Sequence, residues 1–566
     1  MRLAVLLLIA HSGRAQDAPP PPPDSIPPLK PPERCTVQGS VVNAVSGEPL
    51  KKAHVVLSPI DNNSTGNLPT YGAITGADGL FSVEEIDPGR YSIFVSRTGF
   101  VSPNQTPSKR NAIRSVLTLS AGQTMKGLRF KIVPQAVVAG RVVDEDNEPV
   151  VDANVSCMRY QYSSGNKILG SVGTASTNDK GEFRIFGLAA GKCYVSAILR
   201  QNGSGANEVR KELASEQGYV QTYYPSSVSA SSAIAVNVGA GAEVSGIEIR
   251  LRRLKMVHVS GVVTNLPSQF KSAGVLLFRR DGELFGMSDA RSTRIGANGR
   301  FSIRDVGPGS YTVVASYWNE NQSRTAIALI DVGDAHVEGL QLALATDPEI
   351  SGTLVTEGAP QRGAAAASPA ASIPTPVMPA QVGLYPEDVQ IILTPNGSIR
   401  DDGTFLLKNI GPLRYRINVW PMPTNAYVKR VQLGDQEIKG GAIDFRSGVT
   451  ARDLTITVSM NGAQIEGVVR EDDQPSVNAT VVLVPGDPTL RNYYADATSD
   501  QNGHYILRGV APGKYKLYAF DEIERGAYQD PDFMQPYENH SESIEIAESA
   551  HATRDLKLIL NDESAK

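Results

Sequence analysis

Residues 77–91 read ADGLFSVEEIDPGRY, and this stretch decides the fold because its pattern returns along the chain. A turn glycine, Gly79, stands two residues before Phe81, and Tyr91 follows ten residues later. Alternation of Phe81 and Val83 with polar residues is typical of a half-buried strand. The Asp-Gly and Pro-Gly pairs are turn signals. The stretch therefore predicts two strands joined by a tight turn.

The same pattern occurs at five places, with glycine-to-glycine intervals of 102, 118, 104 and 100 residues. We expect the ten aromatic residues of the pattern to be buried between two sheets: Phe81, Phe183, Phe301, Phe405, Tyr505, Tyr91, Tyr194, Tyr311, Tyr415 and Tyr515. Each copy begins with a glycine-containing strand, at Gly39, Gly140, Gly261, Gly352 and Gly467. Each ends in strict alternation, as in Leu128, Phe130 and Ile132. Such fixed spacing indicates an internal repeat.

About seven short strands per ~100 residues, with turn signals every 8–12 residues, indicate a β-sandwich. The predicted fold is therefore all-β, a tandem array of five sandwiches. The predicted units span residues 35–134, 135–253, 254–346, 347–460 and 461–566, and the fourth carries an Ala/Pro-rich insertion at 359–379.

Several motifs resemble the carboxypeptidase regulatory-like domain. They are the turns Gly47-Glu48-Pro49 and Asn147-Glu148-Pro149, the pair Ala53/Val55, and the Gly-x-Phe and Pro-Gly-x-Tyr patterns. The resemblance implies a prealbumin-like sandwich, similar to collagen-adhesin B-type repeats and grouped with carbohydrate-binding-like folds, as found in exported bacterial proteins. In carboxypeptidases this module is an accessory domain, and the sequence here contains no H-x-x-E zinc pair.

The start of the chain predicts export. Arg2 precedes an apolar stretch, residues 3–10, and small residues at 13 and 15 suit cleavage before Gln16. Residues 1–15 are thus a predicted signal peptide, and residues 16–34, with nine prolines, a polyproline linker. No later segment approaches the ~20 apolar residues of a membrane helix. We expect periplasm, cell surface or extracellular space, with no stable membrane insertion after signal removal.

Charge and motifs argue against several functional classes. With 54 Lys+Arg and 59 Asp+Glu the net charge is −5, which disfavours nucleic acid as a partner. The sequence has no H-E-x-x-H, G-x-S-x-G or P-loop motif, so we predict no catalytic, cofactor or metal site and no enzyme. The acidic turn 144–147 resembles a fragment of a calcium loop, but a polar turn is favoured.

Two cysteines of the second copy leave a disulfide open. Alternation places Cys157 inward, whereas Cys193 adjoins the predicted core residue Tyr194 and is expected outward. This difference disfavours a bond between them, although an exported protein permits one.

Three aromatic residues are candidates for a ligand or a domain junction: Trp318, Trp420 and Phe520. Each follows a central tyrosine strand at opposite parity to its core, with Asn319, Asn321, Asn425 and Tyr427 as polar neighbours. The expected function is a non-catalytic exported scaffold, spacer or binding protein of the cell envelope. The alternative is a carbohydrate-binding protein with polysaccharide or envelope components as partners, and an enzyme comes third.

Connections of only 8–10 residues separate consecutive copies. We therefore expect neighbouring copies to touch, and stacking end to end predicts a rod of roughly 150–200 Å.

Overall fold

The computed structural model describes residues 33–60, 69–101, 114–163, 165–199, 217–267, 273–280, 290–318, 323–358, 380–387, 394–446, 448 and 453–560. The predicted signal peptide, most of the polyproline linker and the insertion 359–379 lie outside these residues. The largest hydrophobic clusters each draw on one stretch of chain. We name units 1 to 5 by the first and last residues of those cores: Cys35–Ile132, Ala136–Leu251, Val257–Leu344, Ile350–Val458 and Ala463–Leu558.

Unit 1 shows the plan of the repeat. One sheet has the order β4-β1-β7 and the other the order β3-β2-β5-β6, with the core between them. Its strands are β1 (Cys35–Asn43), β2 (His54–Pro59), β3 (Tyr71–Ile74), β4 (Leu80–Ile86), β5 (Gly89–Ser96), β6 (Arg114–Leu119) and β7 (Thr124–Ile132).

Units 2 and 3 repeat the plan with sheets β11-β8-β16 and β21-β18-β24 facing sheets built on β9/β12 and β19/β22. Unit 2 contains β8 (Ala136–Val143), β9 (Asn154–Ser163), β10 (Asn166–Ser176), β11 (Glu182–Leu188), β12 (Gly191–Ile198), β13 (Gln217–Tyr219), β14 (Thr222–Tyr223), the 3₁₀ helix η1 (Ala230–Ser232), β15 (Val236–Val238) and β16 (Glu243–Arg250). After β17 (Arg253–Lys255), unit 3 contains β18 (Val257–Thr264), β19 (Ala273–Arg279), β20 (Arg291–Arg294), β21 (Arg300–Val306), β22 (Gly309–Trp318), β23 (Ser323–Val332), β24 (Val337–Ala343) and β25 (Ala345–Thr346).

Unit 4 pairs the sheets β29-β26-β34-β31-β32 and β28-β27-β30-β33, and in unit 5 β40 also pairs with β43, which joins its two sheets. Unit 4 contains β26 (Ile350–Glu357), β27 (Gln381–Pro386), β28 (Asn396–Ser398), β29 (Thr404–Leu407), β30 (Arg414–Trp420), β31 (Tyr427–Leu433), β32 (Gln436–Glu437), η2 (Lys439–Gly441), β33 (Ala442–Asp444) and β34 (Asp453–Ser459). Unit 5 contains β35 (Ala463–Glu471), β36 (Gln474–Pro475), β37 (Thr480–Pro485), η3 (Arg491–Tyr493), β38 (Ala495–Thr498), β39 (His504–Val510), β40 (Gly513–Phe520), η4 (Ala527–Gln529), α1 (Pro531–Met534), η5 (Gln535–His540), β41 (Glu542–Ile546), β42 (His551–Thr553) and β43 (Leu556–Ile559).

The glycine of the opening strand lets the closing segment approach in units 1, 2, 3 and 5, whereas Gly352 of unit 4 makes room for the Phe405 ring. Opening and closing strands pair in parallel, as β1 does with β7 and β18 with β24. A Cβ added at Gly39 or Gly261 would overlap the carbonyl oxygen of the closing strand, Leu128 or Leu340. Only a residue without a side chain fits there.

Nine of the ten predicted core aromatics are confirmed, because each is at most 5% exposed. Tyr194 is the exception: it is half-buried on the outer face of its sheet, where its ring meets Tyr160. The extra residue before Tyr194 shifts the parity of β12, so that Cys193 occupies the inward position. The expectation that Cys193 points outward is therefore wrong, and it is fully buried, as is Cys157. Both thiols are free.

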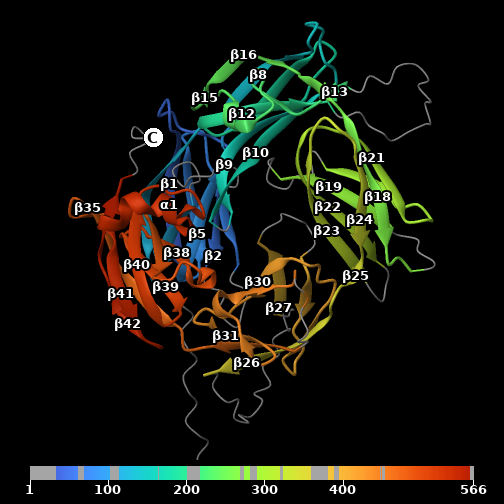
Figure 1. The fold of residues 1–566 in the computed structure, drawn as a ribbon. Helices are drawn as coiled ribbons and strands as arrows, with labels where there is room; N and C mark the ends of the chain where they lie inside the picture. The colour runs from blue at the N-terminus through green and yellow to red at the C-terminus, as the bar shows by residue number, and fades with distance from the viewer. Residues whose placement is uncertain are drawn as a thin grey trace, which may run out of the picture.

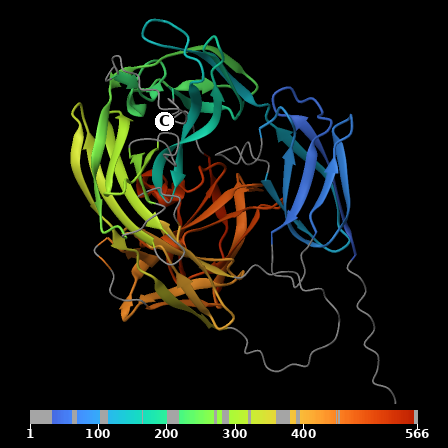
Figure 2. The same ribbon diagram turned by 90° about the vertical axis from the view of Figure 1, so that its right-hand side faces the viewer.

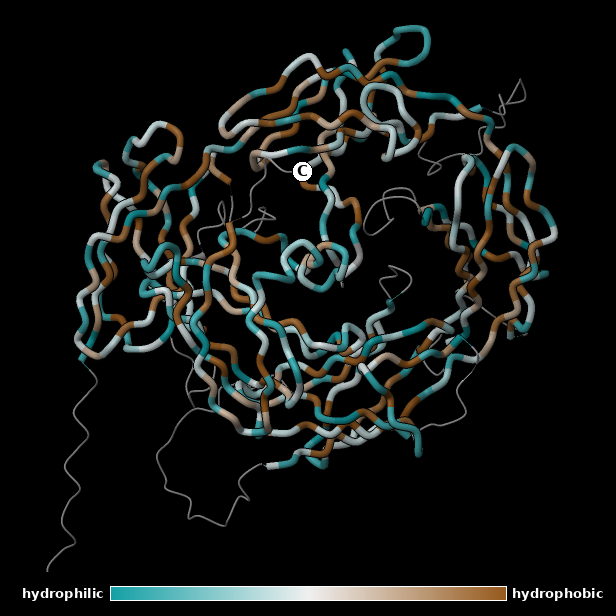
Figure 3. Tube along the Cα trace, turned by 60° about the vertical axis from the view of Figure 1, so that its left-hand side comes forward, coloured by the Kyte–Doolittle hydropathy of each residue, from teal (hydrophilic) through white to brown (hydrophobic). Residues whose placement is uncertain are grey.

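The units do not form a rod. Units 2 to 5 follow one another around a ring, and unit 1 lies beside unit 5 (Figure 1, Figure 3). Figure 2 shows the same arrangement from the side, with unit 1 in blue next to the red unit 5. The predicted contact between neighbours is confirmed for units 3 and 4, where Ile327 packs against the unit 4 core, and for units 4 and 5, where the Tyr427 hydroxyl donates to Glu548. The predicted end-to-end stacking is wrong.

Unit 5 contacts unit 1 through the Gln501 side chain, whose amide forms the two backbone hydrogen bonds that a neighbouring strand would form. The Gln501 amide accepts a hydrogen bond from the Thr118 N–H (3.1 Å) and donates one to the Thr118 carbonyl (3.0 Å). The Thr118 hydroxyl also donates to Asp500 (2.9 Å). Because β6 is an edge strand, its free backbone groups invite such pairing.

Unit 5 also touches unit 2, across the ring. Phe533 in α1 packs edge-on against Tyr162 of β9, with ring centroids 5.6 Å apart. Tyr162 packs on a buried cluster that includes Phe520. Phe520 points away from the unit 5 core, as the alternation predicts, but it is 1% exposed and therefore not an exposed aromatic residue. The helical segment after β40, absent from the other units' described residues, covers it.

Candidate functional site

An aromatic and ionic face on unit 4

The two tryptophans lie at corresponding strand ends in different surroundings. Trp318 ends β22 and is 65% exposed. Trp420 ends β30 and is half-buried on the outer face of its sheet. Both point away from their cores, as the alternation of the sequence predicts.

The outer face of β27 and β30 gives Trp420 a prepared surface. Across the two strands Gln381 lies opposite Trp420, Gly383 opposite Asn418, and Tyr385 opposite Arg416. The indole leans over Gly383, since a Cβ there would lie 2.5 Å from a ring carbon. Its ring meets that of Tyr385 edge-on, at 6.0 Å and 61°.

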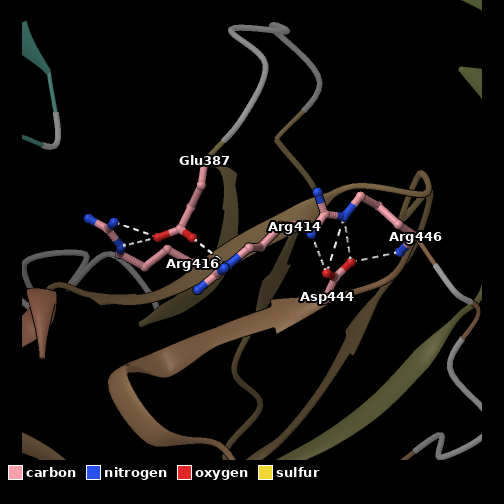
Figure 4. A network of polar contacts seen from close by, with 5 residues as sticks. All are labelled: Glu387, Arg414, Arg416, Asp444 and Arg446. Atoms are coloured by element: carbon pink, nitrogen blue, oxygen red, sulfur yellow. Dashed lines mark hydrogen bonds and ion pairs between the residues drawn. The ribbon is translucent and has the colours of Figure 1, made fainter. Parts of the chain in front are cut away.

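An ion-pair network continues this face (Figure 4). Glu387 accepts hydrogen bonds from Arg416 (3.1 and 2.5 Å) and pairs with Arg414 (2.8 Å). Asp444 lies opposite Arg414 on β33 and accepts from Arg446 at 2.9 Å. Hydrogen bonds from Arg446 lower the pKa of Asp444 to about 2. We call the surface from Trp420 to Asp444 the unit 4 face.

The residues of the unit 4 face share the parity of Trp420. The alternation that places Tyr415, Ile417 and Val419 in the core also places Arg414, Arg416 and Asn418 outside, a signal that the sequence analysis did not use. Only the register with β27, which a single sequence does not give, brings Tyr385 beside Trp420. An aromatic surface flanked by charged hydrogen-bonding groups is suited to stacking a ring and binding its hydroxyls.

The polar residues that the sequence analysis places near the tryptophans do not contribute to the unit 4 face. Asn319 and Asn321 lie outside the described residues. Tyr427 is buried at the junction of units 4 and 5, where its hydroxyl donates to Glu548 (3.1 Å). Burial raises the pKa of Tyr427 to about 12. The Asn425 carbonyl accepts from Gly462 at the same junction.

The acidic turn at residues 144–147 has a structural role. The acidic turn after β8 is a polar turn in which Asp144 accepts the N–H groups of Asp146 and Glu148, each at 2.9 Å. In the part of the chain that the structure describes, no three His, Cys, Asp or Glu residues are grouped so as to hold a metal ion. None of the described helices has the length and apolarity of a membrane span.

One comparison with known proteins concerns unit 1. Residues 36–132 match the family model "Carboxypeptidase regulatory-like domain". Unit 1 is thus similar to this domain over nearly its whole length. In the other units the opening strand also carries a glycine and pairs with the strand of the Gly-x-Phe or Gly-x-Tyr pattern and with the closing strand, and the aromatics of the pattern except Tyr194 are buried.

Among solved structures the chain is similar to several pilins. The minor pilin GBS52 of Streptococcus agalactiae has 13% identity and a TM-score of 0.23, over 39% of this chain and 96% of that one. The major pilin BcpA of Bacillus cereus has 10% identity and a TM-score of 0.15, over 55% and 99%. The Bacillus anthracis TIE protein has 10% and 0.15, over 92% and 76%. A search of curated proteins gives no match. Likenesses this distant carry no information about activity.

Proposed function

We propose that the protein is an exported, non-catalytic scaffold of the cell envelope, a ring of sandwiches rather than a spacer rod. The closure of the chain supports this proposal, because unit 5 contacts units 1, 2 and 4 at once through Thr118, Tyr162 and Tyr427. Each contact alone is small, but together they restrict the hinges between units. A rigid ring holds several surfaces in fixed relative positions, which is what a scaffold requires.

Small-angle scattering of the mature chain tests the ring. We expect a largest dimension well below the roughly 150–200 Å of five stacked sandwiches. Gln501→Ala together with Tyr162→Ala removes contacts of unit 5 with units 1 and 2 and is expected to lengthen the particle. A native chain that scatters as a rod contradicts the proposal.

Cell fractionation tests export. Mass spectrometry of the envelope or medium fraction is expected to show a chain that starts at Gln16. A full-length chain retained in the cytoplasm, starting at Met1, argues against the predicted signal peptide.

The second candidate function is carbohydrate binding through the unit 4 face, which the stacking of Trp420 on Gly383 beside Tyr385 favours. We expect Trp420→Ala to reduce retention on insoluble polysaccharide or isolated cell envelope with a nearly unchanged melting temperature. Trp318→Ala is the matched control, because Trp318 is exposed on another unit. Retention that survives Trp420→Ala while stability falls assigns Trp420 to packing only.

A further inference from the structure

The two cysteines of unit 2 lie together in its core. Val195 of β12 lies opposite Cys157 of β9, and Cys193 stands two residues before Val195 on the same inward face. The two cysteines are therefore diagonal neighbours across one strand pair. Both are fully buried and belong to the same hydrophobic cluster. The alternation argument against a bond between them no longer applies, because it placed Cys193 on the outer face.

The two thiols are in direct contact. They share a hydrogen bond in which the Cys157 thiol is the donor and the Cys193 sulfur the acceptor. Cys193 is the third residue of β12 and lies at the end of the strand, close to the bend at residues 189–190. Closing the contact to the ~2.05 Å of a disulfide therefore needs only side-chain rotation and a small shift of the strand end.

A cation stands beside the pair. Arg159 lies one step beyond the Tyr194–Met158 pair, and so opposite Cys193. Among the described residues its guanidinium donates to two backbone carbonyls rather than to a carboxylate, and its Nε–H is buried without a hydrogen-bond partner. A thiolate at Cys193 thus offers this buried cation an anion.

The pKa values of the two thiols follow from this arrangement. The hydrogen bond from Cys157 and the nearby Arg159 cation hold the pKa of Cys193 below its usual range, against the effect of burial. The same hydrogen bond and burial raise the pKa of Cys157. Cys193 is therefore the thiolate of the pair and Cys157 its proton donor, and a thiolate is the attacking group in thiol–disulfide exchange.

A short strand controls access to Cys193. The start of β12 pairs with β15, from Gly191 opposite Val238 to Cys193 opposite Val236. β15 has three residues, so its detachment requires less free energy than the unfolding of unit 2. An oxidant reaches the sulfur while β15 is detached or before it docks during folding. Docking of β15 then buries the sulfur.

We propose that Cys157 and Cys193 form an intrachain disulfide in the exported chain, which links β9 to β12 inside unit 2. The proposal rests on the proposed export, because oxidising compartments preserve such bonds. The structure describes the reduced chain, in which both thiols are free.

The oxidant is a disulfide present in the surrounding compartment, and the exchange has two steps. The Cys193 thiolate attacks one sulfur of this disulfide, whose S–S bond breaks, so that a mixed disulfide forms and one thiolate leaves. Cys157 then loses its proton and attacks the Cys193 sulfur, and the mixed disulfide breaks with loss of a second thiolate. The protein gives up two electrons and two protons, and the oxidant takes them up as two thiols.

Oxidative refolding of the mature chain tests the bond outside the cell. The chain is unfolded with a reductant, refolded with reduced and oxidised glutathione, alkylated in denaturant and mapped by mass spectrometry. We expect one linked peptide pair, which joins Cys157 to Cys193. Cys35 is the internal control, because it is buried in unit 1 against the Ser120 carbonyl (3.0 Å), and we expect it to be alkylated. Three alkylated cysteines overturn the proposal, as do links to Cys35 at equal yield.

The burial of the bond predicts resistance to reduction. We expect dithiothreitol to reduce it at least tenfold more slowly in the refolded chain than in denaturant. Cys35→Ala is the matched control variant and is expected to form the same bond, whereas Cys157→Ala is expected to leave Cys193 alkylated. The mapping of the unchanged sequence decides the proposal even where Cys157→Ala fails to fold. Equal reduction rates in buffer and denaturant place the bond in a misfolded chain and overturn the proposal.

The chain isolated from cells separates this proposal from export itself. A chain of the envelope fraction that starts at Gln16 is expected to contain the Cys157–Cys193 bond, and three free thiols in it overturn the proposal. A chain retained in the cytoplasm, starting at Met1, contradicts export, and the refolding experiment then decides the bond.

Discussion

Units 2 and 3 carry an arginine at the same register position, and the two side chains differ in burial. In unit 3 Arg279 lies opposite Tyr311. In unit 2 Arg159 lies one step beyond the Tyr194–Met158 pair, and so opposite Cys193. Arg159 is buried and donates to the carbonyls of Ala189 (2.5 Å) and Ala190 (3.0 Å). Arg279 is half-buried, and its guanidinium lies beside the backbone of Gly309.

The size of the facing residue explains the difference. In units 1, 3 and 5 a tyrosine hydroxyl donates to the carbonyl four residues earlier, as Tyr91 does to Asp87 and Tyr515 to Ala511. Cys193 is too short for that bond, and Ala189 is four residues before it. The space that a tyrosine ring would fill admits the Arg159 guanidinium, which satisfies the same carbonyl. A buried acceptor needs a partner, whichever residue supplies it.

Arg159→Ala is expected to give the largest effect. It leaves the buried Ala189 carbonyl and the half-buried Ala190 carbonyl without the arginine as donor and opens a cavity, at a cost of about 3–5 kcal/mol. Calorimetry measures the loss, and hydrogen exchange with mass spectrometry locates it in unit 2. If the variant is as stable as the native chain, the Ala189 and Ala190 carbonyls do not need the arginine as a donor, and the comparison fails.

Cys193→Tyr tests the size argument directly. A tyrosine ring beside Arg159 overpacks the core and is expected to cost about 1–3 kcal/mol. In the double variant with Arg159→Ala, the tyrosine has room and its hydroxyl faces the Ala189 carbonyl. The double variant should then be more stable than the sum of the two single changes predicts, by more than about 1 kcal/mol. Strict additivity contradicts the proposed exchange of partners.

The surroundings of Tyr194 show which features the sequence can predict and which it cannot. Period-2 alternation predicted the strands, the sheet faces and nine of the ten core aromatics, because each signal is local. The prediction failed at Tyr194. One extra residue between Phe183 and Tyr194 moves Cys193 to the inward position, and Arg159 takes over the hydrogen bond to the Ala189 carbonyl. The alternation placed Trp420 outside but not beside Tyr385, since that contact depends on strand register. It gave the wrong shape because the Thr118–Gln501 contact joins residues that no local pattern relates.

Contact between the thiols adds a readout in unit 2. Hydrogen bonding to the Cys193 thiol and burial raise the pKa of Cys157. We expect the native chain to react with a thiol reagent slowly at neutral pH, and Arg159→Ala to expose both thiols faster through local opening. Equal rates in the two proteins contradict the role assigned to Arg159 in holding the unit 2 core closed.

Tyr311→Phe removes only a hydroxyl. The Gly307 carbonyl loses its donor, and the expected cost is about 0.5–1.5 kcal/mol by urea unfolding. Tyr515→Phe removes the equivalent bond to Ala511 and should cost a similar amount in unit 5. If Tyr311→Phe lowers the free energy of unfolding as much as Arg159→Ala does, the packing around the ring determines the loss, and not the number of carbonyls that keep a donor.

Arg279→Ala is expected to have the smallest effect on stability, below about 1 kcal/mol. The Gly307 carbonyl of unit 3 has the Tyr311 hydroxyl as its donor, so this carbonyl keeps its partner when the guanidinium is removed. The side chain is only half-buried and stands at a junction, where polar truncations cost little. Thermal unfolding of this variant beside Arg159→Ala therefore compares one register position in two units. If Arg279→Ala is as costly as Arg159→Ala, the arginine of unit 3 is as structural as that of unit 2, and the size of the facing residue does not explain the difference between them.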